Sequence, residues 1–238
     1  MTLPTTRTRP FLDRKNTIRL LKLITHIGAL LPLALLVYGF FYDTLGADPI
    51  REITLKTGKT ALILLVLSLA VTPLTIWFNW KAVTPLRKPL GLYAFLYVCL
   101  HLLTFVGLDY GFMWGLIGEA IFEKRYALVG FTAFVLLVPL AATSTKWAMK
   151  RLGRNWKRLH QLVYVIAVLA LVHYFWLVKN TYSQPILFAV IVGVLLLSRV
   201  KPVRQQIVRW RRGAVRLVKR GPKRPLPTDP FASHLSGK

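Results

Sequence analysis

Histidine is the residue type in this sequence that is best suited to bind a metal or to carry protons. A single cysteine, Cys99, excludes an internal disulfide, a cysteine-bound iron–sulfur cluster and a cysteine-rich zinc site. Two histidines stand thirteen residues apart at the ends of one apolar run, "NWKRLHQLVYVIAVLALVHYFW". Any metal would therefore be bound mainly by histidine. The five histidines are His26, His101, His160, His173 and His234.

The chain around these histidines is apolar enough to span a membrane. It has 238 residues, of which 55% are hydrophobic, and 33 Lys+Arg stand against 8 Asp+Glu. Such a positive charge would suit nucleic acid. Stretches such as "LLKLITHIGALLPLALLVYGFF" leave too few polar side chains to face water, however, whereas about 20 apolar residues suffice to cross a bilayer as a helix. We therefore expect no nucleic-acid partner and predict an all-α integral membrane protein that is embedded in lipid.

Six apolar segments predict a bundle of six transmembrane helices. The first segment follows several basic residues and has no small-residue cleavage site, so we interpret it as a retained helix and not as a signal peptide. The prediction divides the chain into a basic N-terminal segment (1–19), a transmembrane domain (20–200) and a basic tail (201–238). The segments lie at about 20–42, 60–80, 90–108, 126–143, 160–178 and 184–200.

The connections between these segments differ in charge from one side of the membrane to the other. The termini and the connections on their side hold 27 Lys+Arg and two acids, whereas the remaining connections hold six Lys+Arg and six acids. By the positive-inside rule, both termini are cytoplasmic. The basic tail is expected to lie on anionic lipid, and a docking site for a soluble partner is the alternative.

Depth in the membrane separates the histidines into two groups. His160 enters the fifth segment from the cytoplasmic side, and thirteen residues at about 1.5 Å each place His173 roughly 20 Å further out. His101 lies past the midpoint of the third segment, which also runs outward, and so reaches a similar depth. Two imidazoles at one depth on neighbouring helices are the arrangement that a haem iron with two histidine ligands requires. We predict that His101 and His173 bind such an iron.

A partner for His160 is less obvious. On the third segment, Arg87 stands fourteen residues before His101 and close to the same helix face. Arginine is a poor iron ligand but could pair with a haem propionate, and His26 lies at a suitable depth to take its place. On a straight helix, residues thirteen apart point roughly 140° from each other. His160 and His173 therefore serve different groups, or the helix bends.

Three stretches together resemble one known family. They are "RKPLGLYAFLYVCLHLLTF" on the third segment, "TSTKWAMKRLGRNWKRLHQLVYVIAVLALVHYFW" leading into the fifth, and "LGADPIREITLKTGKTAL" after the first. The chain resembles the bacterial MsrQ family, formerly YedZ, over about residues 20–199. It is more distantly similar to the transmembrane ferric reductase and NADPH oxidase superfamily, in which histidine pairs on two helices hold stacked haems.

The resemblance implies a ferric reductase-like bundle in the bacterial inner membrane that binds haem b. Such a subunit takes electrons from the quinone pool, or from a cytoplasmic flavin reductase, and passes them to MsrP, a periplasmic molybdopterin enzyme that reduces methionine sulfoxide in proteins. The family is also reported to carry FMN. Its haem histidines correspond to His101, His160 and His173, whereas the wider superfamily has histidine at the position of Arg87.

Two other functions stay open at this point. A transmembrane reductase of ferric or other metal ions would use the same haem ligands, and a proton-coupled permease could use the histidines as a proton relay. Many permeases contain internal inverted repeats, of which this sequence gives no clear sign. No nucleotide-binding signature is present. The "LGADPIRE" loop either is a tight turn, with Thr57 helping to start the next helix, or contacts a partner or quinone.

Overall fold

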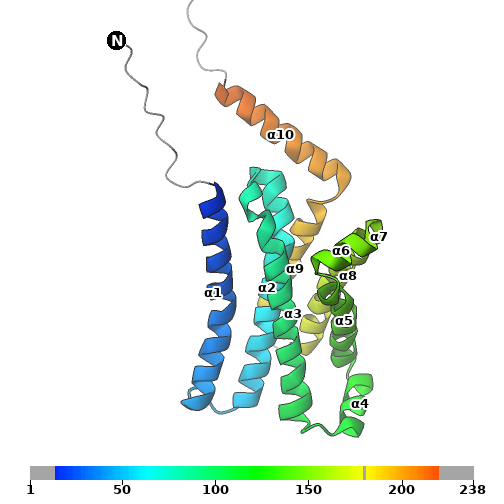
Figure 1. Cartoon of the computed structure of the whole chain (residues 1–238). Coiled ribbons are helices and arrows are strands. Elements are labelled where there is room, and N and C mark those ends of the chain that lie inside the picture. Colours follow the sequence, from blue (N-terminus) through cyan, green and yellow to red (C-terminus); the bar gives the residue numbers. More distant parts are fainter. Residues whose placement is uncertain (1–13, 179–180, 220–238) are drawn as a thin grey trace, which may run out of the picture.

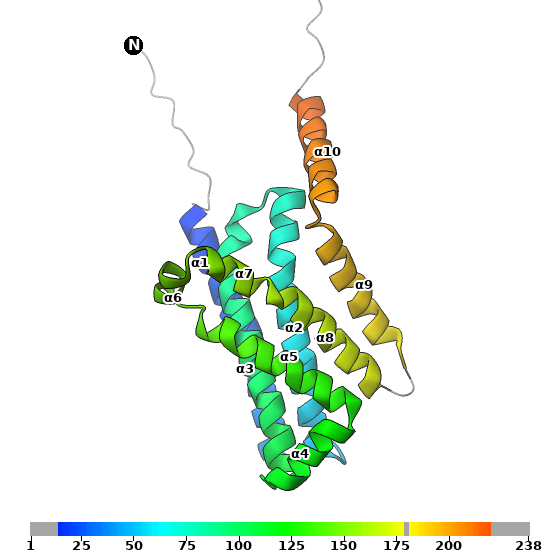
Figure 2. The same ribbon diagram turned by 90° about the vertical axis from the view of Figure 1, so that its right-hand side faces the viewer.

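The structure, a computed structural model, describes residues 14–178 and 181–219, and within these ranges every regular element is helical (Figures 1 and 2). Most of the predicted N-terminal segment, the end of the basic tail and His234 lie outside the described residues. The elements are α1 (Arg14–Phe41), α2 (Pro49–Phe78), η1 (Lys81–Leu86), α3 (Arg87–Leu103), η2 (Thr104–Asp109), α4 (Trp114–Glu123), α5 (Arg125–Ala142), α6 (Lys146–Leu152), α7 (Arg154–His160), α8 (Leu162–Leu177), α9 (Ser183–Leu197) and α10 (Lys201–Lys219).

Five stretches of helix in the described ranges are each long and apolar enough to cross a membrane. They are α1, α2, α5 and two composite spans, Lys81–Asp109 and Arg154–Leu177. Helices α9 and α10 are apolar and long enough only when taken together. They count as a sixth span if the 80° turn between them is treated as a bend within one span. This arrangement confirms the predicted all-α membrane fold. The predicted sixth segment corresponds mainly to α9, and the described part of the tail is the separate helix α10.

The second span begins well before the predicted residue 60. Asp48 caps the helix by accepting a hydrogen bond from the backbone N–H of Arg51 at 3.1 Å, and Pro49 occupies the first turn, where its missing N–H costs nothing. Thr57 is buried two turns further on and donates to the carbonyl of Ile53 at 2.7 Å. The expectation that Thr57 helps to start this helix was therefore wrong.

Two predicted connections also contain helices. The connection at 109–125, which the charges predict to be outer, holds α4, and the connection at 144–159, predicted to be cytoplasmic, holds α6 and most of α7. The third span ends in η2, a short π-helix with a wider turn than an α-helix, directly after the turn that carries His101. Helices α4 and α6 and most of α7 lie outside the predicted apolar segments because their polar and glycine residues interrupt the apolar runs, whereas η2 lies almost entirely within the third segment.

The core of the bundle forms around α2. In α2, 56% of an apolar 18-residue stretch is buried inside the protein, against 22% or less of the equivalent stretch in each of the other four spans. The most extensive helix pairings are α2 with α3 and α5 with α8, and these two hairpins lie next to each other (Figure 2). Side chains on α1 such as Leu31 and Leu35 are more than half exposed. In a membrane, such apolar exposure faces lipid and carries no solvation cost.

Candidate metal centre

The structure brings His101 of α3 and His173 of α8 side by side. The centres of their rings are 6.1 Å apart and the ring planes are inclined by 83°. Metal bonds to imidazole nitrogen are about 2.0–2.1 Å long, so two imidazoles on opposite sides of one ion have ring centres roughly 6 Å apart. The observed separation therefore fits one metal ion between the two rings with little movement.

Each of these imidazoles is held by one backbone carbonyl. The Nδ1 atom of His101 lies 2.9 Å from the carbonyl oxygen of Thr54 on α2, and the Nδ1 atom of His173 lies 2.7 Å from that of Tyr126 on α5. A carbonyl oxygen only accepts hydrogen bonds, so Nδ1 must carry the proton in both rings. The lone pair is then on Nε2, which is the protonation state of a histidine that binds a metal.

A glycine lies against each ring. A Cβ atom added at Gly58 on α2 would lie 3.1 Å from Nδ1 of His101, and one added at Gly130 on α5 would lie 2.7 Å from Nδ1 of His173. Contacts below 3.0 Å require something to shift. The two glycines therefore let each imidazole pack directly on the backbone of the neighbouring helix.

The two hairpins share one local sequence pattern that the sequence analysis missed. In each, the carbonyl residue precedes its histidine by 47 positions, and the glycine follows the carbonyl residue by four. The pattern G-x-T-A-x-x-L-L-V occurs in α2 as "GKTALILLV" and in α5 as "GFTAFVLLV". Both copies run in the same direction through the bundle (Figure 1), so this repeat is not the inverted type that is common in permeases.

The ligand chemistry of this pair suits haem better than a bare metal ion. Within the described residues, no group of three or more His, Cys, Asp or Glu side chains could hold a metal ion. Two imidazoles alone leave most coordination positions unfilled, whereas a porphyrin supplies the four equatorial nitrogens and needs only axial ligands from the protein.

His160 lies apart from this pair, at the junction of α7 and α8. Its Nδ1 atom lies 3.1 Å from the carbonyl oxygen of Trp156, and its ring stacks on the Trp156 indole with centres 3.9 Å apart. Its Nε2 atom is buried and has no hydrogen-bond partner among the described residues. A buried nitrogen without a hydrogen-bond partner is costly, so the Nε2 atom of His160 is available to bind a ligand.

The turn between α7 and α8 separates His160 from His173 along one span. The N–H of Gln161 bonds to the carbonyl of Arg158, and the N–H of Tyr164 bonds to that of Gln161, both across three residues. Such bonds tighten the turn in the manner of a 3₁₀-helix. Arg154–Leu177 nevertheless forms one span.

Arg87 and His26 have partners of their own. The Arg87 guanidinium donates to the hydroxyl of Thr72 on α2. Its positive charge is repelled by that of Arg199. His26 on α1 is hydrogen-bonded through Nδ1 to the hydroxyl of Tyr93 on α3 at 2.8 Å. No contact between His26 and His160 is present in the described part of the chain.

Arg199 extends from the end of α9 into the same region. It donates from Nη1 to the hydroxyl of Tyr164 at 2.7 Å, lies over that ring at 5.0 Å and also donates to the carbonyl of Leu69. Its Nε atom is buried without a partner among the described residues. Arg87 and Arg199 have no acidic neighbour in the described structure. This end of the bundle is therefore suitable for a carboxylate or another anion.

The chain is similar to known membrane proteins. Residues 57–171 match the family described as ferric reductase like transmembrane component. The chain is 46% identical over 185 residues to a protein of Xanthomonas axonopodis pv. citri, an alignment that covers 75% of this chain and 85% of the relative. That relative is named protein-methionine-sulfoxide reductase heme-binding subunit MsrQ. The chain belongs to the MsrQ family.

Two further MsrQ relatives show that the match extends over most of the chain. A protein of Rhodospirillum rubrum is 44% identical over 189 residues, with 79% of this chain and 91% of the relative covered. One of Xanthomonas campestris pv. campestris strain 8004 is 42% identical over 215 residues, with 88% and 94% covered. No solved structure matches the chain. Together with the membrane-spanning helices, the MsrQ match identifies a multi-pass membrane protein.

Proposed function

We propose that this chain is the haem-binding electron-transfer subunit of a methionine sulfoxide reductase system, and that His101 and His173 are the axial ligands of a haem b iron. The observation that carries the proposal is the facing pair of imidazoles, 6.1 Å apart between ring centres, with Nδ1 of each ring held by a carbonyl. The printed name of the MsrQ relatives supports the cofactor and the system.

In this proposal, the chain's own residues position and tune the ligands. The carbonyls of Thr54 and Tyr126 orient the two rings and increase the electron density on Nε2. The apolar helices keep water away and hold the site at low dielectric, which together with the ligands sets the redox potential. Bound haem would supply reversible one-electron transfer. No nucleotide-binding signature is present in this chain, so the electrons come from another molecule.

The proposed direction of electron transfer is supported by the charge asymmetry and by the depth of the histidine pair. The six acids of the described residues lie in or next to the outer connections, whereas basic residues dominate the other end. This asymmetry supports cytoplasmic termini in a bacterial inner membrane. The His101–His173 pair then lies in the periplasmic half, where electrons would leave for an MsrP-like molybdopterin reductase. Quinol within the membrane is the proposed source, and FMN and a cytoplasmic flavin reductase are further proposals that rest on the family resemblance alone.

We further propose that His160 binds a second group on the cytoplasmic side. Its buried Nε2 atom lacks a partner among the described residues. Arg87 and Arg199 would pair with the carboxylates of such a group, and a second haem fits this chemistry. His160 would then be the imidazole ligand on one side of that iron.

Visible spectroscopy of the detergent-purified chain tests the haem proposal. We expect a Soret band that shifts on reduction with dithionite, and one or two haems per chain by pyridine haemochrome assay. A preparation from haem-sufficient cells that shows no Soret band would overturn the haem proposal and favour the permease reading.

A second measurement tests the electron path. The chain is placed in liposomes with a quinol inside the bilayer and an MsrP-like reductase outside. We expect the reduced absorption bands to decay when methionine sulfoxide is added, and to persist when either the reductase or the sulfoxide is left out. Decay with ferric chelates but not with the reductase and sulfoxide would instead identify a metal reductase.

A further inference from the structure

Helix α10 is attached to the end of α2 by one arginine. After the 80° turn from α9, α10 extends past the cytoplasmic end of the bundle (Figure 1). Arg211 donates from Nη1 to the carbonyl of Ile76 at 2.6 Å and to that of Thr75 at 3.4 Å. These carbonyls lie in the last turn of α2, where they have no partner within the helix and carry the negative end of its dipole. The contact fixes α10 beside α2.

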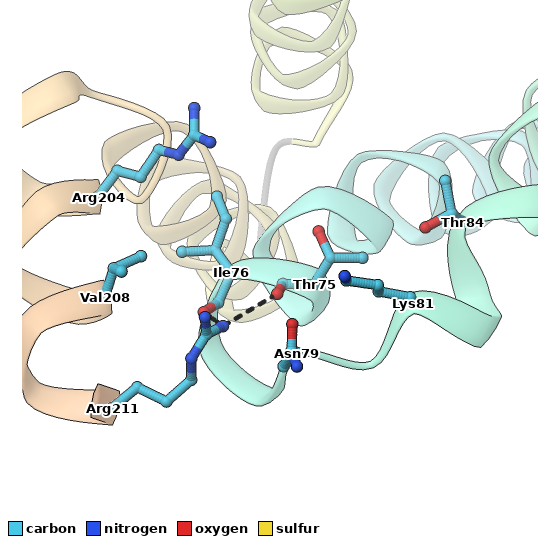
Figure 3. Close-up of a pocket in the computed structure, with 8 residues that line it drawn as sticks. All are labelled: Thr75, Ile76, Asn79, Lys81, Thr84, Arg204, Val208 and Arg211. Atoms are coloured by element: carbon cyan, nitrogen blue, oxygen red, sulfur yellow. Dashed lines mark hydrogen bonds between the residues drawn. The ribbon is translucent and has the colours of Figure 1, made fainter. Parts of the chain in front are cut away.

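A pocket of about 300 Å³ lies beside this contact, between α2, η1 and α10 (Figure 3). Three of its lining side chains are cations: Lys81 from η1, and Arg204 and Arg211 from α10. Figure 3 shows Lys81 extending toward Thr75 from the side opposite Arg211. The pocket also contains the Thr84 hydroxyl, and none of its lining residues is acidic. Cations and hydroxyl donors that line one pocket are suited to a phosphate group.

These cations have no counter-charge within the described chain. Every acidic residue of the described ranges lies in or next to the two outer connections, and the one ion pair formed there joins Lys56 to Glu52 at 2.9 Å. The six acids are Asp43, Asp48, Glu52, Asp109, Glu119 and Glu123. Within the described residues nothing balances the positive charge around the pocket, so an anion bound there would be stabilised.

The depth of the pocket identifies the source of that phosphate. The α2 span ends at Phe78, and the pocket lies at its last turn, which is the level expected for lipid headgroups when a helix of this length crosses a bilayer. On α10, Val203, Ile207 and Trp210 follow one another at helical spacing, and the Trp210 side chain is 71% exposed. An apolar stripe next to a basic face is typical of a helix that lies in the membrane interface. The geometry points to a binding site for the phosphodiester of an anionic phospholipid, such as phosphatidylglycerol.

Native mass spectrometry of the full-length protein, released from detergent micelles, tests this site. Phosphatidylglycerol and phosphatidylcholine of the same acyl chains are titrated separately, and inorganic phosphate is added as a competitor. We expect phosphatidylglycerol to bind at least about tenfold more tightly than phosphatidylcholine, because each basic residue near an anionic headgroup contributes substantially. Millimolar inorganic phosphate should displace little of it, because free phosphate cannot use the apolar surface.

The matched variants remove equal charge at two places. Lys81→Gln with Arg204→Gln removes two pocket cations but keeps the Arg211 contact, so α10 should stay attached to α2. Lys150→Gln with Arg154→Gln removes two exposed cations from α6 and α7 on the same side of the membrane. We expect about a tenfold loss of phosphatidylglycerol affinity in the first double variant and less than a twofold loss in the second. Gel-filtration profiles and thermal midpoints check that both variants are folded.

Three outcomes would overturn the proposal. Equal loss in both double variants would mean that general surface charge attracts the lipid. Equal affinity for the two lipids would mean that the headgroup charge is not recognised. Displacement of phosphatidylglycerol by inorganic phosphate at similar concentrations would identify a site for a soluble anion.

Discussion

The two hairpins at the centre of the molecule, α2 with α3 and α5 with α8, are alike at one end and different at the other. At the outer end, each offers a carbonyl, a glycine and a histidine at the same spacings. At the end that is predicted to be cytoplasmic, α3 begins with Arg87, bonded to Thr72, whereas the α7–α8 span carries His160, stacked on Trp156. Equivalent histidines therefore lie side by side only at the outer level. The metal site proposed there would be symmetric, whereas a group bound by His160 at the other end would meet different side chains on the two hairpins.

Removing either histidine of the outer pair should have the largest effect. His101→Ala and His173→Ala should each eliminate the same low-spin haem, because one imidazole alone leaves an axial position open. Haem per chain and the electron paramagnetic resonance spectrum measure this. His234→Ala, in the tail, is the control and should leave both unchanged. Retention of the low-spin signal in either pair variant would mean that the two hairpins do not share one iron.

Alanine at Gly130 should disturb its histidine more than alanine at Gly58 does. Gly130→Ala places a Cβ 2.7 Å from His173, whereas Gly58→Ala places one 3.1 Å from His101. Overpacking of this kind costs about 1–3 kcal/mol, and we expect greater haem loss and a larger change in reduction potential at Gly130. Gly193→Ala meets no atom within 4 Å and serves as the control. Equal, negligible effects at Gly58 and Gly130 would show that the rings are not held against these helices.

Arg87→His should make the inner ends of the two hairpins more alike. If the inner levels face each other as the outer levels do, this variant should show an additional low-spin signal, because imidazoles would then stand on both hairpins. Adding His160→Ala should remove that signal and leave the outer one. A spectrum that Arg87→His does not change would show that the two positions cannot share one iron.

The smallest effect concerns how α3 is anchored. The Tyr97 side chain is fully buried, and its hydroxyl donates to the carbonyl of Ala29 on α1 at 2.7 Å. Tyr97→Phe should lower the free energy of unfolding by about 1 kcal/mol, because the carbonyl loses its partner, and should leave the haem spectrum unchanged. Thermal unfolding in detergent measures the difference, with Tyr38→Phe as an exposed control. A loss of haem in Tyr97→Phe would show that the α1 contact positions the ligand helix.

The helix boundaries show where hydropathy is informative and where it is not. The apolar centre of every span was predictable, because lipid selects long apolar runs. The polar start of α2, "PIREITLKTGK", lies outside the second apolar segment, although Asp48 followed by Pro49 is a recognisable helix start. Helix α4 likewise lies in a connection between apolar segments. Hydropathy measures whether a segment dissolves in lipid and does not measure whether polar residues at its ends continue the helix.

The sequence by itself determined the membrane fold, its charge asymmetry and the matching depth of His101 and His173, because these depend on residue order along single helices. The tertiary structure decided which carbonyl holds each ring, why Gly58 and Gly130 lie where they do and that Arg211 joins α10 to α2. These contacts connect residues that are far apart along the chain. They exist only after α2 is surrounded by the other helices, and so the spacing within one helix carries little information about them.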